Sequence, residues 1–315
     1  MTKLRSFICG IKGTQLSIKE INFLKKFRPW GIILFSRNIK TIQQTQLLTK
    51  NIKMLFNNNN YPILIDEEGG RVSRLSKFID STNFSAEFFG KLYLKDKKKF
   101  NYFFEIYINQ ISYLLNLLGI NINTVPVLDL RRKKSHNIIG NRSYSFDKKV
   151  VSKIGDLCVS NFHKNNIFTI VKHIPGHGLA KVDSHKNLPK IDNKYSYLSK
   201  NDFFTFMNKN NSFAMTGHLI YSKLDPDNSV THSQKVIKII RKKIGFNNLI
   251  ISDDISMKAL KYSISENTKK AFTAGCNLVL HCNGNLREMT QVAKNSPLIN
   301  NFIIKKTKHF YSIIR

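Results

Sequence analysis

The chain has 315 residues, of which 42% are hydrophobic, and a formal net charge of +31 at pH 7. No run of its residues reaches the roughly 18 consecutive apolar positions of a membrane-spanning helix. The basic N-terminus is followed by too short an apolar stretch for a secretory signal, and no cleavage site follows. We therefore expect a globular protein of the cytoplasm, with no membrane partner.

The positive charge is spread along the whole chain rather than gathered in one motif. Lysines stand beside Asn, Ile, Phe and Tyr, as in NKYSYLSKN at 193–201. These residue types share A/T-rich codons, so a bias in base composition explains the charge without a binding surface. We expect no specific nucleic acid partner, although the charge favours attraction to anionic ligands.

Four cysteines, at positions 9, 158, 276 and 282, are scattered and form no CxxC pair. Their apolar flanks predict buried thiols rather than disulfides or zinc ligands. A reducing compartment fits this usage.

Short β-branched runs alternate with longer segments of helical periodicity. The predicted strands are 6–11, 31–35, 61–66, 122–129, 168–174, 212–218, 248–254 and 277–282. The predicted helices are 17–27, 41–56, 97–118, 148–165, 199–209, 233–244, 263–274 and 285–295. Most of the strands are continuous apolar runs, which is typical of parallel strands buried on both faces. Ser17 followed by Glu20 predicts a capping box at the first helix.

Eight strand–helix repeats are the number found in a closed parallel barrel. An open doubly wound sheet is the alternative, but no Gly-x-Gly-x-x-Gly follows the first strand. Composition does not shift along the chain. The predicted fold class is therefore α/β, a single (β/α)₈ TIM-type barrel, with residues 1–315 forming one catalytic domain. The fold predicts that the chemistry lies where the strands end.

Ionisable residues do stand at the ends of the predicted strands. They are Asp66, Asp129, Lys172 with His173, His218, and Asp253 with Asp254. Such groups have no evident packing purpose at the end of an apolar strand. A functional site at one mouth of the barrel is the better interpretation.

The adjacent pair Asp253 and Asp254 needs separate interpretations. Strand alternation directs only one of them along the barrel axis. A carboxylate placed there can attack a sugar's anomeric carbon. We favour this role for Asp253, whereas for Asp254 a helix N-cap ahead of ISMKAL is an equal alternative.

Asp183 and His185 stand two residues apart in VDSH, within the Gly-rich loop that follows Lys172 and His173. In an extended loop both side chains face the same way, so Asp183 can hold His185 in one tautomer. A histidine supported in this way can give and then take a proton near neutral pH.

Arginines near the strand ends offer hydrogen-bond donors for hydroxyl or carboxylate groups. Arg74 and Arg142 are candidate ligand contacts, and for Arg142 an ion pair with an acid in the barrel mouth is also open. For Arg71 we favour an ion pair with Glu67 or Glu68. These two glutamates diverge in direction, and we expect one of them to support the site from behind.

Six motifs carry a family resemblance that runs in order from about residue 6 to residue 290. They are IDEEGGRVSRL, PVLDL, GNRSY, KHIPGHG with DSH, SDDISMKAL, and AGCNLVLHC. Together they resemble the bacterial β-N-acetylglucosaminidases of glycoside hydrolase family 3, in particular the short cytoplasmic branch of peptidoglycan recycling.

The resemblance implies a retaining exo-β-N-acetylglucosaminidase that removes terminal N-acetylglucosamine from muropeptides containing 1,6-anhydro-N-acetylmuramic acid. It implies Asp253 as nucleophile, His185 as acid/base and Asp183 as its dyad partner. The sugar-binding residues would be Asp66, Arg74, Arg142, Lys172 and His173. The family needs no metal or organic cofactor, and we expect a monomer.

Three motifs depart from the family's usual pattern. Glu67 stands in place of Gln in DQEGG, Asn141 replaces the acid before Arg142, and Thr216–Gly217 alter the strand-six motif. None touches a catalytic position, so these changes bear on affinity and rate rather than on reaction type.

Two other functions fit the same barrel. A metal-dependent hydrolase could use His173, His218 and Asp253 as ligands, although the first strand lacks a His-x-His pair. A catalytically decayed sugar-binding protein is the second alternative. The intact DSH and SDD elements argue against it.

Overall fold

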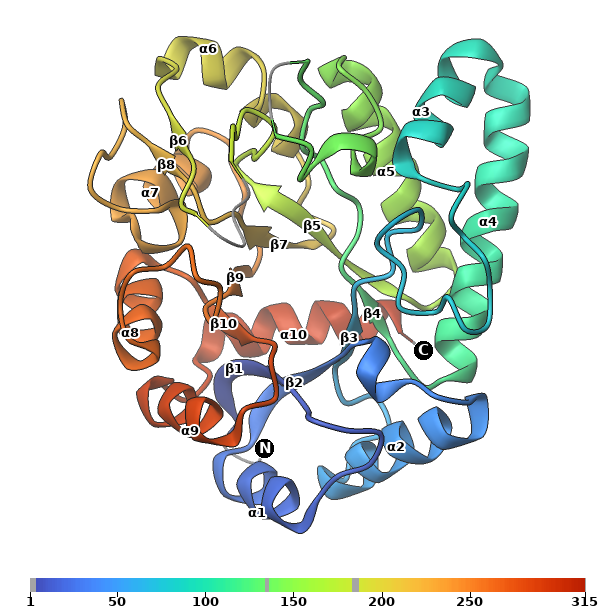
Figure 1. Cartoon of the computed structure of the whole chain (residues 1–315), viewed down its shortest axis with the longest axis vertical. Helices are drawn as coiled ribbons and strands as arrows, with labels where there is room; N and C mark the ends of the chain where they lie inside the picture. The colour runs from blue at the N-terminus through green and yellow to red at the C-terminus, as the bar shows by residue number, and fades with distance from the viewer. Residues whose placement is uncertain (1–3, 134–135, 183–186, 315) are drawn as a thin grey trace.

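The computed structural model describes residues 4–133, 136–182 and 187–314. Within these residues, eight parallel strands close into a barrel, with the last strand pairing back onto the first (Figure 1). In order around the barrel they are β1 (Arg5–Gly10), β2 (Pro29–Leu34), β3 (Ile63–Ile65), β4 (Ile122–Asn123), β5 (Phe168–Ile174), β7 (Phe213–Thr216), β9 (Ile250–Asp254) and β10 (Leu278–His281). The predicted (β/α)₈ barrel is confirmed.

Helices surround the strands (Figure 1). They are α1 (Ile18–Phe27), α2 (Ile42–Leu55), α3 (Ala86–Lys95), α4 (Lys97–Leu117), α5 (Lys148–Lys164), α6 (Tyr195–Lys200), α7 (Gln234–Lys242), α8 (Ile264–Ala274), α9 (Leu286–Asn295) and α10 (Asn301–Ile313). The predicted capping box is present, because Ser17 Oγ accepts from the Glu20 amide and the Glu20 carboxylate accepts from the Ser17 amide. A small parallel sheet of β6 (Lys190–Ile191) and β8 (Ile220–Tyr221) lies outside the barrel.

The segment between β5 and β7 differs from the prediction. The single helix expected over 199–209 is instead α6 followed by a 3₁₀ helix at Phe203–Phe206. Phe203 and Phe206 are both fully buried. A spacing of three residues puts them on one face of a 3₁₀ helix, which has three residues per turn.

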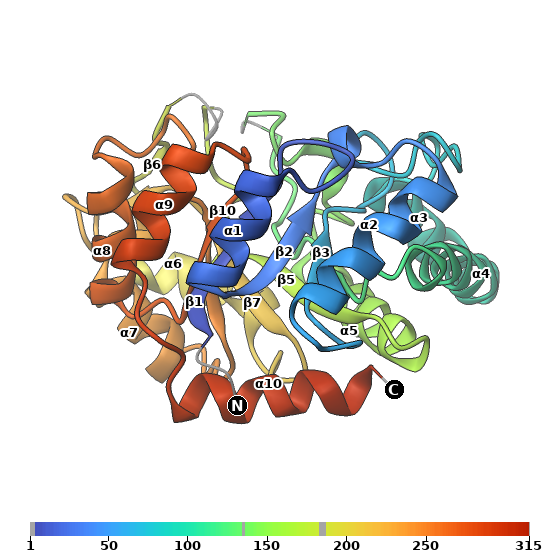
Figure 2. The ribbon, with the colours of Figure 1, turned by 90° about the horizontal axis from the view of Figure 1, so that it is seen from below.

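Two helices were not predicted, and tertiary contacts explain both. In α3, Gly90 lies so close to the next segment that an added Cβ would meet the Tyr144 carbonyl oxygen at 1.6 Å. Glycine is a poor helix former, so its presence in α3 follows from this close approach. The other helix, α10, lies outside the eight strand–helix repeats and crosses the N-terminal end of the barrel (Figure 2).

Apolar side chains fill the barrel lumen and are capped by α10. This lumen core contains residues from every barrel strand, including Ile8, Ile33, Leu64, Ile122, Ile170, Phe213, Ile251 and Leu278, together with Ile303 and Phe310 of α10. Trp30 donates from its indole Nε1 to Thr307 Oγ1 at 2.9 Å. Its ring also contacts that of Phe310, with 6.2 Å between the centroids. The end of the barrel opposite the predicted site is therefore closed.

The cysteines follow the sequence prediction in part. Cys9, Cys158 and Cys276 are buried thiols, whereas Cys282 is partly exposed, and none forms a disulfide within the described residues. None of the helices seen between residues 4 and 314 combines the length and apolar character required to cross a membrane.

The closure by α10 is testable through Phe310, whose side chain is fully buried. Phe310→Ala should lower the free energy of unfolding by about 3–5 kcal/mol, because it opens a cavity beneath the lumen core. Urea denaturation measures the loss. Phe302→Ala is the matched control in the same helix, because that ring is 39% exposed. Equal losses for the two variants would contradict the closing role of Phe310.

Candidate active site

Along each strand, every second side chain faces the lumen. Beyond the apolar core, the next side chains in this lumen-facing series are polar. Leu249, just before β9, and Ile251 within it belong to the lumen core, and Asp253 follows on the same side. In β5, the same step of two leads from Ile170 to Lys172. The equivalent pairs in three further strands are Leu64 and Asp66, Ile122 and Thr124, and Leu280 and Cys282.

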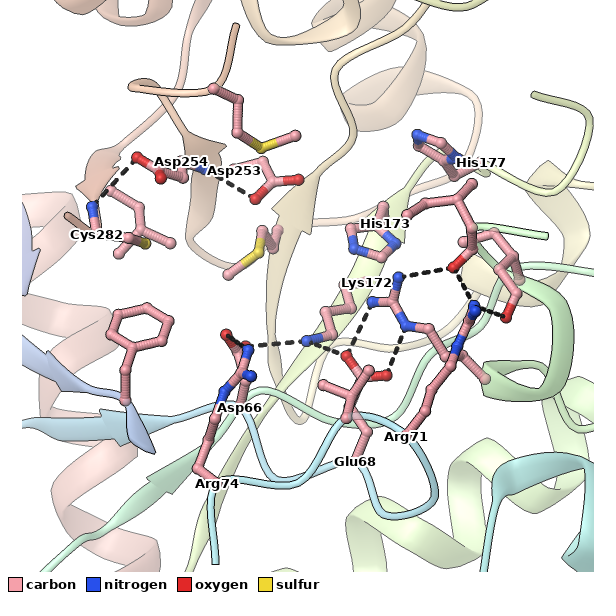
Figure 3. Close-up of a pocket in the computed structure, with 18 residues that line it drawn as sticks. Asp66, Glu68, Arg71, Arg74, Lys172, His173, His177, Asp253, Asp254 and Cys282 are labelled. Atoms are coloured by element: carbon pink, nitrogen blue, oxygen red, sulfur yellow. Dashed lines mark hydrogen bonds and ion pairs between the residues drawn. The ribbon is translucent and has the colours of Figure 1, made fainter. Parts of the chain in front are cut away.

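Of these side chains, Asp66, Lys172, Asp253 and Cys282 line a cavity of about 300 Å³ at the carboxyl end of the strands (Figure 3). The predicted site residues that line it are Asp66, Arg74, Arg142, Lys172, His173 and Asp253. The structure thus brings together six residues taken from three strand ends and two loops. The other two predicted residues, Asp183 and His185, lie outside the described part of the chain.

Four buried charges form the floor of the cavity. Lys172 Nζ lies 3.0 Å from Asp66 Oδ1 and 2.7 Å from Glu68 Oε1. Arg142 donates to both carboxylate oxygens of Glu68, at 2.7 and 2.9 Å. Two acids and two bases therefore compensate one another in a chain of contacts (Figure 3). The alternative prediction, that Arg142 forms an ion pair with an acid in the barrel mouth, is confirmed, and that acid is Glu68.

This network keeps its members charged. Burial opposes ionisation of Asp66, but the Lys172 ammonium and the Arg74 guanidinium outweigh it and lower the pKa of Asp66 to about 2. Burial likewise opposes ionisation of Glu68, yet Arg142 and Lys172 hold the pKa of Glu68 well below its usual range. At neutral pH, Asp66 is therefore a hydrogen-bond acceptor and Lys172 a donor at the cavity surface.

The two arginines of the loop after β3 have different partners. The Arg74 guanidinium lies 3.6 Å from Asp66 Oδ2 and stacks over the Phe35 ring. Arg71 donates to the backbone carbonyls of residues 137–139. The prediction of an ion pair between Arg71 and Glu67 or Glu68 is wrong, because the carboxylates of Glu67 and Glu68 have other partners.

His173 is fixed by Asp129, the residue at which the fourth strand was predicted to end. Its Nδ1 lies 2.6 Å from Asp129 Oδ2, and Asp129 is fully buried. Burial raises the pKa of Asp129, but His173 more than offsets it, so the carboxylate stays ionised. A carboxylate can only accept, so Nδ1 carries the proton and Nε2 faces the cavity.

Asp253 and Asp254 differ in role, as strand alternation predicted. Asp254 accepts from the Ser256 amide at 3.0 Å, the Ser256 hydroxyl at 2.8 Å and the Cys282 amide at 3.2 Å. It therefore caps a turn, whereas the helix expected at ISMKAL is absent from 255–260. Asp253 continues the lumen-facing series and accepts from the Asp254 amide at 2.8 Å.

Glu67 is the glutamate that supports the site from behind. One oxygen, Oε2, accepts from the Arg74 amide at 2.6 Å, the Leu75 amide at 3.0 Å and the Ser73 hydroxyl at 3.1 Å. This carboxylate thereby holds the loop that carries Arg74. Burial exceeds the effect of these hydrogen bonds and raises the pKa of Glu67 to about 7.

Sequence reasoning missed Glu68 as a partner within the ion-pair network and gave Asp129 no role. The neighbouring glutamates look equivalent in sequence, and only the course of the chain directs one into the cavity and the other behind it. His177 was left without a role, and it too lines the cavity.

The metal-site alternative required His218 as a ligand. Its Nδ1 is bonded to Thr231 Oγ1 and its Nε2 to the Asp254 carbonyl, at 2.8 and 3.0 Å. Both donor atoms are thus already engaged away from the cavity. The residues that the structure describes contain no group of three His, Cys, Asp or Glu side chains placed to hold a metal ion.

Replacement of Glu67 by Gln tests the unusual acid. The stability supplied by the protonated Glu67 side chain is complete below pH 4.5 and is lost as the pH rises through about 7. This loss amounts to about 3 kcal/mol of folding free energy. A glutamine at this position does not ionise and therefore does not incur it. Glu67→Gln should therefore raise the melting temperature more at pH 8 than at pH 5. Glu105→Gln, at an exposed position of α4, is the control, and an equal effect of Glu67→Gln at both pH values would contradict the assignment.

Comparison with known proteins places this site in a family. The family model "Glycosyl hydrolase family 3 N terminal domain" matches residues 10–313. A protein named beta-hexosaminidase from Haemophilus influenzae is 30% identical over 308 residues, which cover 95% of this chain and 85% of that protein. Another of that name, from Nitrosomonas eutropha, is 31% identical over 292 residues, covering 89% and 81% respectively.

Solved structures give the same result. NagZ from Neisseria gonorrhoeae in complex with N-trifluoroacetyl-D-glucosamine superposes with a TM-score of 0.85 and 27% identity, covering 98% of this chain and 90% of that one. The closed barrel agrees with this superposition over 98% of the chain. This chain belongs to glycoside hydrolase family 3.

Proposed function

We propose that the protein is a retaining exo-β-N-acetylglucosaminidase that removes terminal N-acetylglucosamine from muropeptides containing 1,6-anhydro-N-acetylmuramic acid, in cytoplasmic peptidoglycan recycling. The observation that carries the proposal is the placement of Asp253 on the lumen side of β9, in the same cavity as the Asp66–Lys172 pair. The relatives named beta-hexosaminidase support the N-acetylhexosaminide class.

The cavity suits a single terminal sugar. Its volume of about 300 Å³ is at the lower end of the range for small-molecule sites, which favours removal of one residue at a time. Asp66 accepts and Lys172 donates, so together they can bind neighbouring sugar hydroxyls. Arg74 and His173 Nε2 extend this set of polar groups, and Arg142 holds Glu68 in place beneath it.

The reaction is a double displacement. The Asp253 carboxylate attacks C1 of the sugar, and the bond from C1 to the leaving oxygen breaks as His185 gives that oxygen a proton. His185 then takes a proton from water, the resulting hydroxyl attacks C1, and the ester bond to Asp253 breaks. Asp183 supports the charged form of His185, a role assigned by resemblance. The proposal needs no cofactor.

The net positive charge of the protein bears on which aglycone the substrate carries. 1,6-Anhydro-N-acetylmuramic acid bears a lactyl carboxylate, so the substrate is anionic, whereas an aryl N-acetylglucosaminide is neutral. A net charge of +31 raises the encounter rate with anionic ligands at low ionic strength. This property favours a muropeptide over a neutral chitin fragment as substrate.

The nucleophile assignment predicts a large and specific loss. Asp253→Ala should lower kcat for an aryl N-acetylglucosaminide by at least roughly 10³-fold, because the glycosyl–enzyme ester cannot form. Asp254→Asn is the matched control; it retains an acceptor for the turn and should stay within roughly tenfold of wild type. An activated fluorinated N-acetylglucosaminide should label the wild-type peptide that contains Asp253. Label on any other carboxylate would contradict the assignment.

The substrate assignment predicts a selective effect of salt. For N-acetylglucosaminyl-1,6-anhydro-N-acetylmuramic acid, kcat/KM should fall roughly tenfold from low to physiological ionic strength. For the neutral aryl substrate it should change little. Steady-state kinetics on both substrates in one salt series provides the test. A parallel fall for the two substrates would show that the charge does not select the aglycone.

A further inference from the structure

His177 is a buried polar side chain without a partner. It is 2% exposed, and neither Nδ1 nor Nε2 has a hydrogen-bond partner in the structure. Buried polar groups in native proteins are nearly always hydrogen-bonded, because a group that loses water without gaining a partner destabilises the fold. The ring therefore has two unused hydrogen-bonding atoms within the ligand-free protein.

The ring lies in the wall of the active cavity, which it shares with Asp253 and His173. The centroids of the His173 and His177 rings are 5.6 Å apart. Figure 3 shows His177 well separated from Asp66 and Arg74, beyond His173. It thus borders the part of the cavity next to His173 and away from Asp66 and Arg74.

The backbone holds this ring firmly in position. The His177 amide donates to Asp129 Oδ1 at 2.6 Å, so Asp129 fixes both cavity histidines. The glycine on each side is required by close contacts: a Cβ on Gly176 would lie 2.8 Å from Asp202 Cβ, and one on Gly178 would lie 2.1 Å from the Leu130 carbonyl oxygen. Such packing provides a preorganised contact for a ligand.

The ring contacts the end of β7 on its other side. A Cβ added at Gly217 would come within 3.0 Å of His177 Cδ2. Burial and the neighbouring His173 lower the pKa of His177 to about 4. At neutral pH the ring is therefore uncharged, with one nitrogen that donates and one that accepts.

The proposed function fixes which part of the sugar meets this ring. If Asp253 attacks C1 and the Asp66 side of the cavity binds the distant hydroxyls, the substituent next to the reacting carbon is the acetamido group at C2. An amide offers one N–H and one carbonyl oxygen, and a neutral imidazole can bind either. The ring oxygen of the sugar is a weaker partner by comparison.

We propose that His177 is a specificity-determining residue that hydrogen-bonds the C2 acetamido group of the terminal sugar. The inference rests on the proposed function and extends it. His177 supplies no proton to the reaction; it gains its missing hydrogen bond only when an N-acetylated sugar is bound. It thereby selects N-acetylglucosaminides over glucosides.

The test compares two competitive inhibitors that differ at C2, N-acetylglucosamine and glucose, against turnover of an aryl N-acetylglucosaminide. His177→Leu should weaken inhibition by N-acetylglucosamine roughly tenfold, the value of one net hydrogen bond, and leave inhibition by glucose unchanged. The melting temperature of the ligand-free variant should be unchanged or higher, because an unpaired polar group has been removed. A merely structural histidine would instead lower the melting temperature and weaken both inhibitors alike.

His232→Leu is the matched control. His232 is also buried and has an unpartnered Nε2, but it lies away from the active cavity. That variant should leave both inhibition constants unchanged. If the His177→Leu enzyme is active and still selects N-acetylglucosamine over glucose as the wild type does, the inference is overturned. That outcome is also expected if the ring contacts the aglycone instead. Absence of turnover by the wild-type protein would instead refute the proposed function.

A measurement on the unaltered protein covers the case in which His177→Leu does not fold. The chain has 9 histidines, and ¹⁵N labelling of histidine makes their ring nitrogens visible by NMR. His177→Gln identifies the His177 signal by its disappearance. In the wild-type protein that signal should shift on addition of N-acetylglucosamine and not on addition of glucose. The same shift with both sugars, or with neither, would contradict the proposal.

Discussion

The ion-pair chain through Asp66, Lys172, Glu68 and Arg142 is the interaction on which the site depends. It joins β5 to the end of β3 and to the loops that follow β3 and β4, so its geometry exists only when these neighbouring strands are paired. Each charge is buried, and a buried charge without its partner is strongly destabilising. This ion-pair network therefore couples the packing of the strand ends to the ionisation of the side chains in the cavity. If one strand end is displaced, both the charge balance and the sugar-facing groups are lost.

Charge at the site is balanced locally although the whole chain is strongly basic. The acids and bases that line the cavity are equal in number: Asp66, Glu68, Asp253 and Asp254 against Arg71, Arg74, Arg142 and Lys172. The net charge of +31 therefore belongs to the rest of the molecule. This separation lets the protein attract anionic ligands over a distance while the cavity keeps the ionisation states that chemistry on a sugar requires.

Asp129 has a second organising role that its position in sequence does not reveal. One fully buried carboxylate fixes the tautomer of His173 and anchors the His177 amide. Glu67 acts in a similar way on the loop after β3, where it accepts from the Ser73 hydroxyl and from the amides of Arg74 and Leu75. Both are acids behind the ligand-facing layer, and each converts a flexible loop into a fixed set of donors.

The sequence by itself determined the barrel, the end of it that bears chemistry, and six of the residues that line the cavity. For the residues at strand ends this follows from local periodicity, because a step of two along a strand places Asp253 on the same side as Ile251 wherever the strand lies. Arg74 and Arg142 stand in loops and were assigned from arginine chemistry and the family resemblance. Alternation also indicated that only one of Asp253 and Asp254 faces the barrel axis, and the family resemblance chose Asp253. The family resemblance supplied the roles of Asp183 and His185, which periodicity does not reach.

Only the tertiary structure decided the features that depend on contacts between distant segments. It directed Glu68 into the cavity and Glu67 behind it, although the two are adjacent in sequence. It explains why a helix, α3, contains Gly90, because Tyr144 approaches too closely for any side chain there, and it placed α10 beneath the lumen core. It left the His177 ring without a partner in the cavity wall. Sequence spacing describes neighbours along the chain, whereas partners across the barrel are fixed only when the barrel closes.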